Sequence, residues 1–246
     1  MYKEVLLLFF IGHFLADYYF QSDELAKKEN KTTTLKHCFI YAGVMIAVIL
    51  PVFSLKLLFI ALIISIVHLL IDFLKYFSRE KKHFKNDQNV ALYLFDQALH
   101  LITILIAGLF LKYTQTKIDL LPFLRRVGQI IPLNIEHTLA WILILLFVSK
   151  PASITIRIIL NNFEPQHKQK EDVGIQNAGA LIGIFERLII LFMLYVNEYA
   201  AIGFVLTAKS VARYNKISEN PQFAEYYLLG TLLSSLIIMV AFYLIF

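Results

Sequence analysis

The stretch LLFIALIISIVHLLIDFLKYF, residues 57–77, decides the fold. It is almost continuously apolar and has the length of about 20 residues that a helix needs to cross the hydrocarbon core of a bilayer. Backbone polar groups in lipid must bond within their own segment, so such a run favours a helix over a strand. Because the pattern recurs along the chain, the sequence predicts an all-α, polytopic transmembrane helical bundle.

The composition of the whole chain agrees with this class. Of its 246 residues 59% are hydrophobic, and they come in blocks rather than in alternation, unlike those of a soluble domain. Residues 117–131 are too polar to cross and are expected to lie in the membrane interface. About eight helices are expected, at 4–20, 35–53, 56–77, 90–112, 135–160, 178–196, 198–214 and 222–245.

Two halves are expected within this bundle. Residues 1–132 would form an N-terminal half with a cluster of His and Asp, and residues 133–246 a C-terminal half with a basic cluster. Cys38 is the only cysteine, which excludes an internal disulfide and any multi-cysteine zinc or iron–sulfur site. The formal charge of +5 is modest, and no nucleic-acid partner is expected.

The orientation in the membrane is predicted from the distribution of Lys and Arg. These residues are concentrated in alternate connections, within 27–36, 75–85, 157–170 and 209–216. Cytoplasmic loops are typically enriched in positive residues, so we expect both termini outside the cytoplasm. The group of cations at 112–126 is the one exception.

Three of the predicted spans carry a histidine and an aspartate four residues apart. Such pairs share one face of a helix. The last span runs opposite to the other two and reverses the pair, so all three place His deeper and Asp about 6 Å nearer the cytoplasmic surface. The pairs are His13 and Asp17 in HFLADYYFQ, His68 and Asp72 in HLLIDFLK, and Asp96 and His100 in FDQALH.

Ionisable side chains within membrane spans usually face the bundle interior and mark a functional site. Imidazole suits zinc and other transition ions, and carboxylate adds neutralising charge. We therefore predict one or two divalent metal ions held by these six residues. The three aspartates are the predicted catalytic residues, as ligands or orienting partners, with one of them as general base in an alternative assignment. Metal-free His–Asp packing or a proton relay is the alternative. Supporting roles are predicted for His37, Lys75 and Gln97.

The polar residues in the spans of the C-terminal half are mostly basic. Several cations at one level would bind an anionic substrate, phosphate in particular. Snorkelling to lipid headgroups is the alternative. For Arg187, which lies well inside an apolar span, an internal partner such as Glu186 or Glu225 is expected. The predicted anion-binding residues are Lys150, Arg187, Lys209 and Arg213, with Glu186 and Glu225 in support.

The three His/Asp motifs together resemble an uncharacterised bacterial membrane family, domain of unknown function 3307. The later stretches NAGALIGIFERLI, TAKSVARY and AEYYLLGTLLS resemble its C-terminal part. The resemblance implies a multi-pass protein of the bacterial inner membrane, with the six residues at motif positions, and implies no activity. A looser similarity, in residue type alone, exists to bacterial membrane-bound metal-dependent hydrolases.

The leading functional hypothesis is a metal-dependent hydrolase with its site near the cytoplasmic face. Its substrate would be a phosphate-bearing lipid or another phosphoester, so the expected partners are the bilayer and an anionic lipid or phosphorylated small molecule. A proton- or metal-coupled transporter is the first alternative. The second is a membrane sensor or effector that acts through a partner protein.

Overall fold

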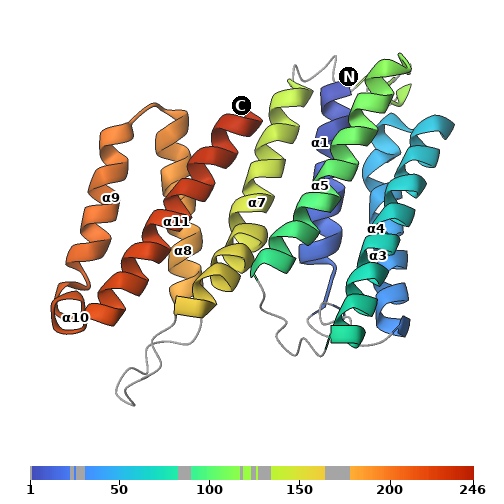
Figure 1. Cartoon of the computed structure of the whole chain (residues 1–246). Helices are drawn as coiled ribbons and strands as arrows, with labels where there is room; N and C mark the ends of the chain where they lie inside the picture. Colours follow the sequence, from blue (N-terminus) through green and yellow to red (C-terminus); the bar gives the residue numbers. More distant parts are fainter. Residues whose placement is uncertain are drawn as a thin grey trace. The chain divides into compact units, whose positions relative to one another are not determined.

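The computed structural model describes residues 2–22, 25, 31–82, 90–116, 119–122, 126, 134–163 and 178–246. Long helices make up most of this part of the chain, which contains no strand (Figure 1). Each of the eight predicted helices is present, with ends within five residues of those expected. Most of the predicted interfacial segment, 117–131, lies outside the described residues.

The chain forms two compact units, residues 1–146 and 147–246. The division falls inside α7 (Ile135–Leu160), which begins in the first unit and ends in the second. The predicted division lies between residues 132 and 133, in the connection before this helix.

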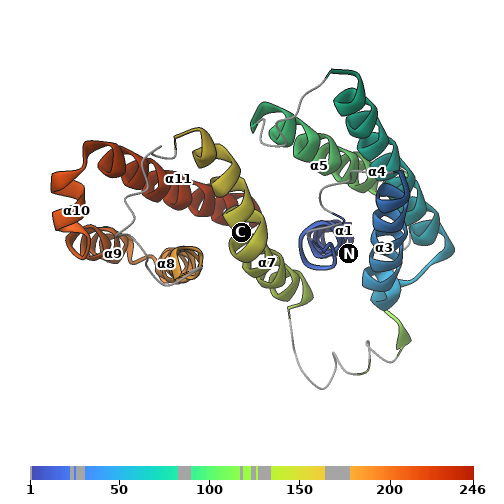
Figure 2. The same ribbon diagram turned by 90° about the horizontal axis from the view of Figure 1, so that it is seen from below.

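The first unit contains a closed four-helix bundle. It is formed by α1 (Tyr2–Phe14), α3 (Lys31–Ile49), α4 (Leu55–Lys82) and α5 (Val90–Tyr113). Each helix packs against the next in this order and α5 packs against α1, so the four enclose one interior, as the view in Figure 2 shows. Cofactor and metal sites of helical bundles are typically built in such interiors, from facing helices.

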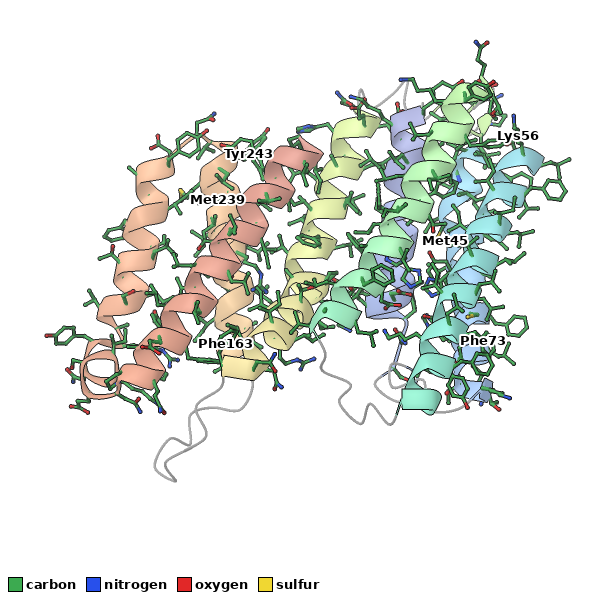
Figure 3. The ribbon with its side chains drawn as sticks, viewed as in Figure 1. Met45, Lys56, Phe73, Phe163, Met239 and Tyr243 are labelled. Atoms are coloured by element: carbon green, nitrogen blue, oxygen red, sulfur yellow. The ribbon has the colours of Figure 1, made fainter. Side chains whose placement is uncertain are left out.

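Apolar side chains fill one end of this interior. They come from the first half of α1, the second half of α3, the first half of α4 and the second half of α5, and Figure 3 shows Met45 among them. The bundle is therefore apolar on the side where α1 begins, and polar residues are left to the other side. Members of this core are Val5, Phe9, Met45, Ile49, Leu57, Ile64, Ile104 and Leu111.

The last part of the first predicted helix is not a regular α-helix. After α1 the chain continues as a π-helical turn, η1 (Leu15–Tyr19), in which the Phe20 N–H donates to the Leu15 carbonyl five residues earlier, at 2.8 Å. Wide turns of this kind are rare and occur frequently at functional sites. This one carries Asp17.

The second unit contains the end of α7 with α8 (Ala178–Tyr195), α9 (Tyr199–Val211) and α11 (Pro221–Ile245). The predicted boundary at Asn197-Glu198 is confirmed, because Asn197 adopts a left-handed φ of 61° between α8 and α9. The short helix α10 (Tyr214–Glu219) was not predicted, since six residues are too few to show a helical period.

Six helices in the described part of the chain are long and apolar enough to cross a membrane, and many of their large apolar side chains point outward, which identifies the chain as a membrane protein. At 13 residues each, α1 and α9 are shorter than this, although the sequence predicted spans at both. The six are Lys31–Val52, Leu55–Phe77, Val90–Tyr113, Ile135–Phe163, Ala178–Tyr195 and Pro221–Ile245.

The close approach of α1 and α3 at Gly12 supports a first prediction. A Cβ atom at Gly12 would lie 2.7 Å from Met45 Sδ, whereas one at Gly43 meets nothing within 4 Å. Gly12→Leu is expected to overpack the bundle and to lower the free energy of unfolding by about 1–3 kcal/mol. The matched control Gly43→Leu should unfold like the wild type. Thermal unfolding in detergent, followed by circular dichroism, measures both, and equal midpoints for the two variants would contradict the packing described.

Candidate metal centre

One histidine from each helix of the first bundle points into its interior. These are His13 of α1, His37 of α3, His68 of α4 and His100 of α5, and all four are buried. The ring centroids lie 5.6 Å apart for His13 and His100, 4.2 Å for His68 and His100, and 5.3 Å for His37 and His68. His37, predicted only to support the site, is therefore in direct contact with it.

Two aspartates lie against the pair His37 and His68, whose Nε2 atoms are 3.1 Å apart. Asp17 Oδ1 is 3.2 Å from His37 Nε2 and 3.5 Å from His68 Nε2. Asp72 Oδ2 is 3.7 Å and 3.4 Å from the same two atoms. In tetrahedral coordination with bonds of about 2.0–2.1 Å, two ligand atoms are separated by about 3.3 Å. These four atoms therefore have spacings close to those of zinc ligands.

A second group adjoins the first around His100. Its Nε2 atom lies 3.6 Å from Asp96 Oδ1 and 3.9 Å from Asp72 Oδ1. Asp96 uses its other oxygen, Oδ2, to accept a 2.8 Å hydrogen bond from the ammonium of Lys75. We refer to the four histidines and three aspartates, His13, Asp17, His37, His68, Asp72, Asp96 and His100, as the His/Asp cluster.

The cluster is ordered in layers along the bundle. On α1 and α4 the apolar core is followed by histidine and, one turn later, by aspartate. On α5, which runs the other way, Asp96 precedes His100 and the core follows. All three helices therefore present apolar residues, imidazole and carboxylate in the same spatial order, as the reversed motif predicted.

Tyr41 is a member of the site that sequence reasoning missed. Its ring stacks on that of His68 with centroids 3.8 Å apart, and its hydroxyl lies 3.3 Å from His13 Nδ1. The available signal was its place one turn after His37 on α3. Among 21 Phe and 13 Tyr residues, most of them explained by lipid or interface contact, that spacing did not stand out.

Gln97 belongs to the outer edge of the cluster, as its predicted supporting role requires. Its amide nitrogen lies 3.5 Å from Asp96 Oδ2, and its Oε1 accepts a 2.8 Å hydrogen bond from the Tyr18 hydroxyl. Tyr93 is 3.0 Å from the same hydroxyl. Polar contacts thus continue past the aspartates, away from the apolar core.

Charge and hydrogen bonding both fit a cation in the cluster. Among the residues that the structure describes, the charged side chains in or next to the cluster are its three aspartates and Lys75. With neutral imidazoles, their net charge is −2. His100 Nε2 and Asp96 Oδ1 face each other at 3.6 Å, slightly beyond hydrogen-bond distance, and His13 Nε2 has no hydrogen-bond partner. Spacings of this size leave room for an ion between the groups.

Groups of potential ligand atoms within 4.8 Å of one another occur three times in the cluster. The first is His13, Asp17 and His68, the second His37, His68 and Asp72, and the third Asp72, Asp96 and His100. All six predicted ligands are therefore brought together. Because His68 and Asp72 each belong to two groups, the three form one continuous site.

The cations of the second unit have different surroundings. The Arg187 guanidinium is buried and donates to the Val148 carbonyl at 2.9 Å and to the hydroxyls of Ser153 and Ser234. Its hydrogen bonds thus go to neutral groups, while the neighbouring Glu186 carboxylate, one of the two predicted partners, interacts with it electrostatically and pairs with Lys209.

Lys209 is bound on two sides. Its ammonium pairs with Glu186 and donates to the Thr231 hydroxyl at 3.0 Å. Lys150, Arg213 and Glu225 are exposed. Of the four cations predicted to bind an anion, Arg187 and Lys209 therefore contact internal partners, whereas Lys150 and Arg213 lie at the surface.

Residues 5–124 match the model of a family described as protein of unknown function (DUF3307). This region of the chain is similar to that family. The DUF3307 region contains the whole His/Asp cluster and ends before the second unit. The C-terminal stretches that were predicted to resemble the family lie outside the match. Neither a curated protein nor a solved structure matches the chain.

The pair formed by Lys75 and Asp96 supports a prediction for the DUF3307 region. Lys75→Met leaves a buried carboxylate without its cation, so the metal-free protein should lose about 1–3 kcal/mol of unfolding free energy. The double variant Lys75→Met/Asp96→Asn should recover part of this loss, because the charge is removed as well. Thermal unfolding in detergent with a chelator present measures both.

The matched control is Lys56→Met, at the exposed start of the same helix, α4 (Figure 3). It should unfold like the wild type. A Lys75→Met variant as stable as this control would show that the pair contributes nothing.

Proposed function

We propose that the chain is a membrane metalloprotein whose His/Asp cluster binds a divalent transition-metal ion such as zinc. The observation that carries this proposal is the spacing of His37 Nε2, His68 Nε2, Asp17 Oδ1 and Asp72 Oδ2, with five measured separations between 3.1 and 3.7 Å. Imidazole and carboxylate are ligands that zinc and related ions accept. The net charge of the contacting side chains supports the same assignment.

The reaction class that this proposal favours is hydrolysis of a phosphate ester. A bound divalent ion supplies a Lewis acid and lowers the pKa of a coordinated water to about 7. The chain supplies ligands fixed on packed helices and outer contacts, such as that of Lys75 with Asp96, that orient them. In this proposal Asp17, Asp72 and Asp96 act as ligands, and a phosphate-bearing lipid or another phosphoester is the substrate.

The phosphate of that substrate requires cationic contacts. The four residues predicted to provide them, Lys150, Arg187, Lys209 and Arg213, all lie in the second unit. Arg187 and Lys209 already have partners within the second unit, which a substrate would have to replace. The positive-inside pattern supports a site near the cytoplasmic face of a bacterial inner membrane, with both termini outside the cytoplasm.

Burial of the cluster favours transport as a second candidate. His13, His37 and Asp72 are completely buried among the helices that hold them. Intramembrane His and Asp in such positions are typical of proton relays and ion paths. A proton- or metal-coupled transporter would use the same residues, so the two candidates differ in what the purified protein does with them.

The metal content of the purified protein tests whether the cluster binds a metal ion. Elemental analysis of the detergent-purified chain should detect stoichiometric zinc, manganese or iron. His68→Ala, which removes a central imidazole, should lose most of this metal. His137→Ala is the matched control, because His137 is an exposed histidine outside the cluster, hydrogen-bonded to Trp141, and should retain it. Wild-type protein without metal after reconstitution with these ions would refute the metal centre.

Turnover separates the two candidates. Hydrolysis of bis(p-nitrophenyl) phosphate by the zinc-loaded protein should fall by about 100-fold or more in Asp72→Asn and on chelation, and should return when zinc is added back. Uptake of zinc or protons into sealed vesicles is measured in parallel. Metal-dependent uptake without hydrolysis of any phosphoester would replace the hydrolase by the transporter.

A further inference from the structure

We infer that the His/Asp cluster binds two divalent ions and that the Asp72 carboxylate bridges them. The inference rests on the proposed metal centre and specifies its nuclearity. Its starting point is the orientation of Asp72, whose two oxygens face different imidazoles. Oδ2 lies 3.4 Å from His68 Nε2 and 3.7 Å from His37 Nε2, whereas Oδ1 lies 3.9 Å from His100 Nε2.

The first ion position lies among His37, His68, Asp17 and Asp72. With four protein ligands it corresponds to a closed site, in which the protein fills the coordination shell. Such a site holds an ion firmly and leaves no position for a reacting molecule.

The second ion position lies among His100 Nε2, Asp96 Oδ1 and Asp72 Oδ1. The His100 side chain is 2% exposed, and its Nε2 atom is aimed at the two carboxylates without a hydrogen-bond partner. Three protein ligands with an open coordination position are typical of catalytic zinc sites. The second ion is thus the one that a substrate can reach.

The second ion position lies at the more exposed edge of the cluster, next to Lys75 and Gln97. The Lys75 side chain is 17% exposed, more than any aspartate in the cluster. By holding Asp96 Oδ2 at 2.8 Å it also leaves only Oδ1 for an ion. Access along this edge brings a ligand to the open ion past an ammonium group, which favours an anion.

The net charge of the cluster with two ions also indicates an anionic substrate. The contacting side chains carry −2, so one divalent ion makes the cluster neutral and a second gives it +2. An excess of positive charge buried in an apolar bundle requires an anionic ligand. Two ions about 3.5–4 Å apart are the arrangement that hydrolyses phosphate esters in other enzymes, because they stabilise both the attacking and the leaving oxygen. The two-ion centre therefore takes a phosphate ester, reached from the side of Lys75.

Titration of the metal-free full chain in detergent with Mn²⁺ tests the inference. Bound ion is measured by elemental analysis after desalting, and the exchange coupling between ions by electron paramagnetic resonance. The wild type should bind two equivalents and give the coupled spectrum of a bridged pair. His100→Ala should bind one equivalent and give the spectrum of an isolated ion, whereas the control His137→Ala should behave like the wild type.

Each other outcome has a separate meaning. One equivalent in the wild type, or an uncoupled spectrum at two equivalents, overturns the bridged pair and leaves the proposed metal centre standing. No bound Mn²⁺ in the wild type overturns the bridged pair, and no bound zinc in the same titration overturns the metal centre itself. Asp96→Asn repeats the test without removing a ring, and the wild-type spectrum decides between one ion and two even where neither variant folds.

Discussion

Burial of seven ionisable side chains in the middle of an apolar helical bundle is the constraint on which the rest of the first unit depends. Unpaired carboxylates in a low-dielectric interior are strongly destabilising, so their partners must come from the bundle itself or from a bound ion. Each helix contributes one imidazole, three contribute a carboxylate, and Lys75 neutralises only part of the charge. In the metal centre proposed above, a divalent cation would turn this unfavourable burial into a bond network that fixes all four helices.

The helices and most of the cluster could be predicted because they depend on local periodicity. Apolar blocks of membrane length predict the membrane spans. The reversed order of Asp96 and His100 on an antiparallel helix predicts that histidines and aspartates lie in separate layers. The central place of His37 and the stacking of Tyr41 could not be predicted, because α3 carries no aspartate four residues from its histidine. The π-helical turn at Asp17 is likewise set by packing rather than by a sequence signal.

The buried charged side chains of the two units have different partners. In the second unit Arg187 is solvated by a carbonyl and two hydroxyls, and Glu186 is neutralised by Lys209, so these groups have partners without any added ion. In the first unit three carboxylates face a single ammonium, that of Lys75, so an excess of negative charge remains. This contrast, within a single chain, is the reason for assigning metal chemistry to the DUF3307 region alone.

Anomalous diffraction from crystals of the zinc-loaded protein, recorded on both sides of the zinc absorption edge, is the most direct measurement of the metal centre. The account predicts a zinc-specific peak inside the first bundle, about 2.0–2.2 Å from His37 Nε2 and His68 Nε2. Zinc-loaded crystals with no peak inside the bundle, and with these imidazoles hydrogen-bonded only to each other, to carboxylates or to water, would contradict it.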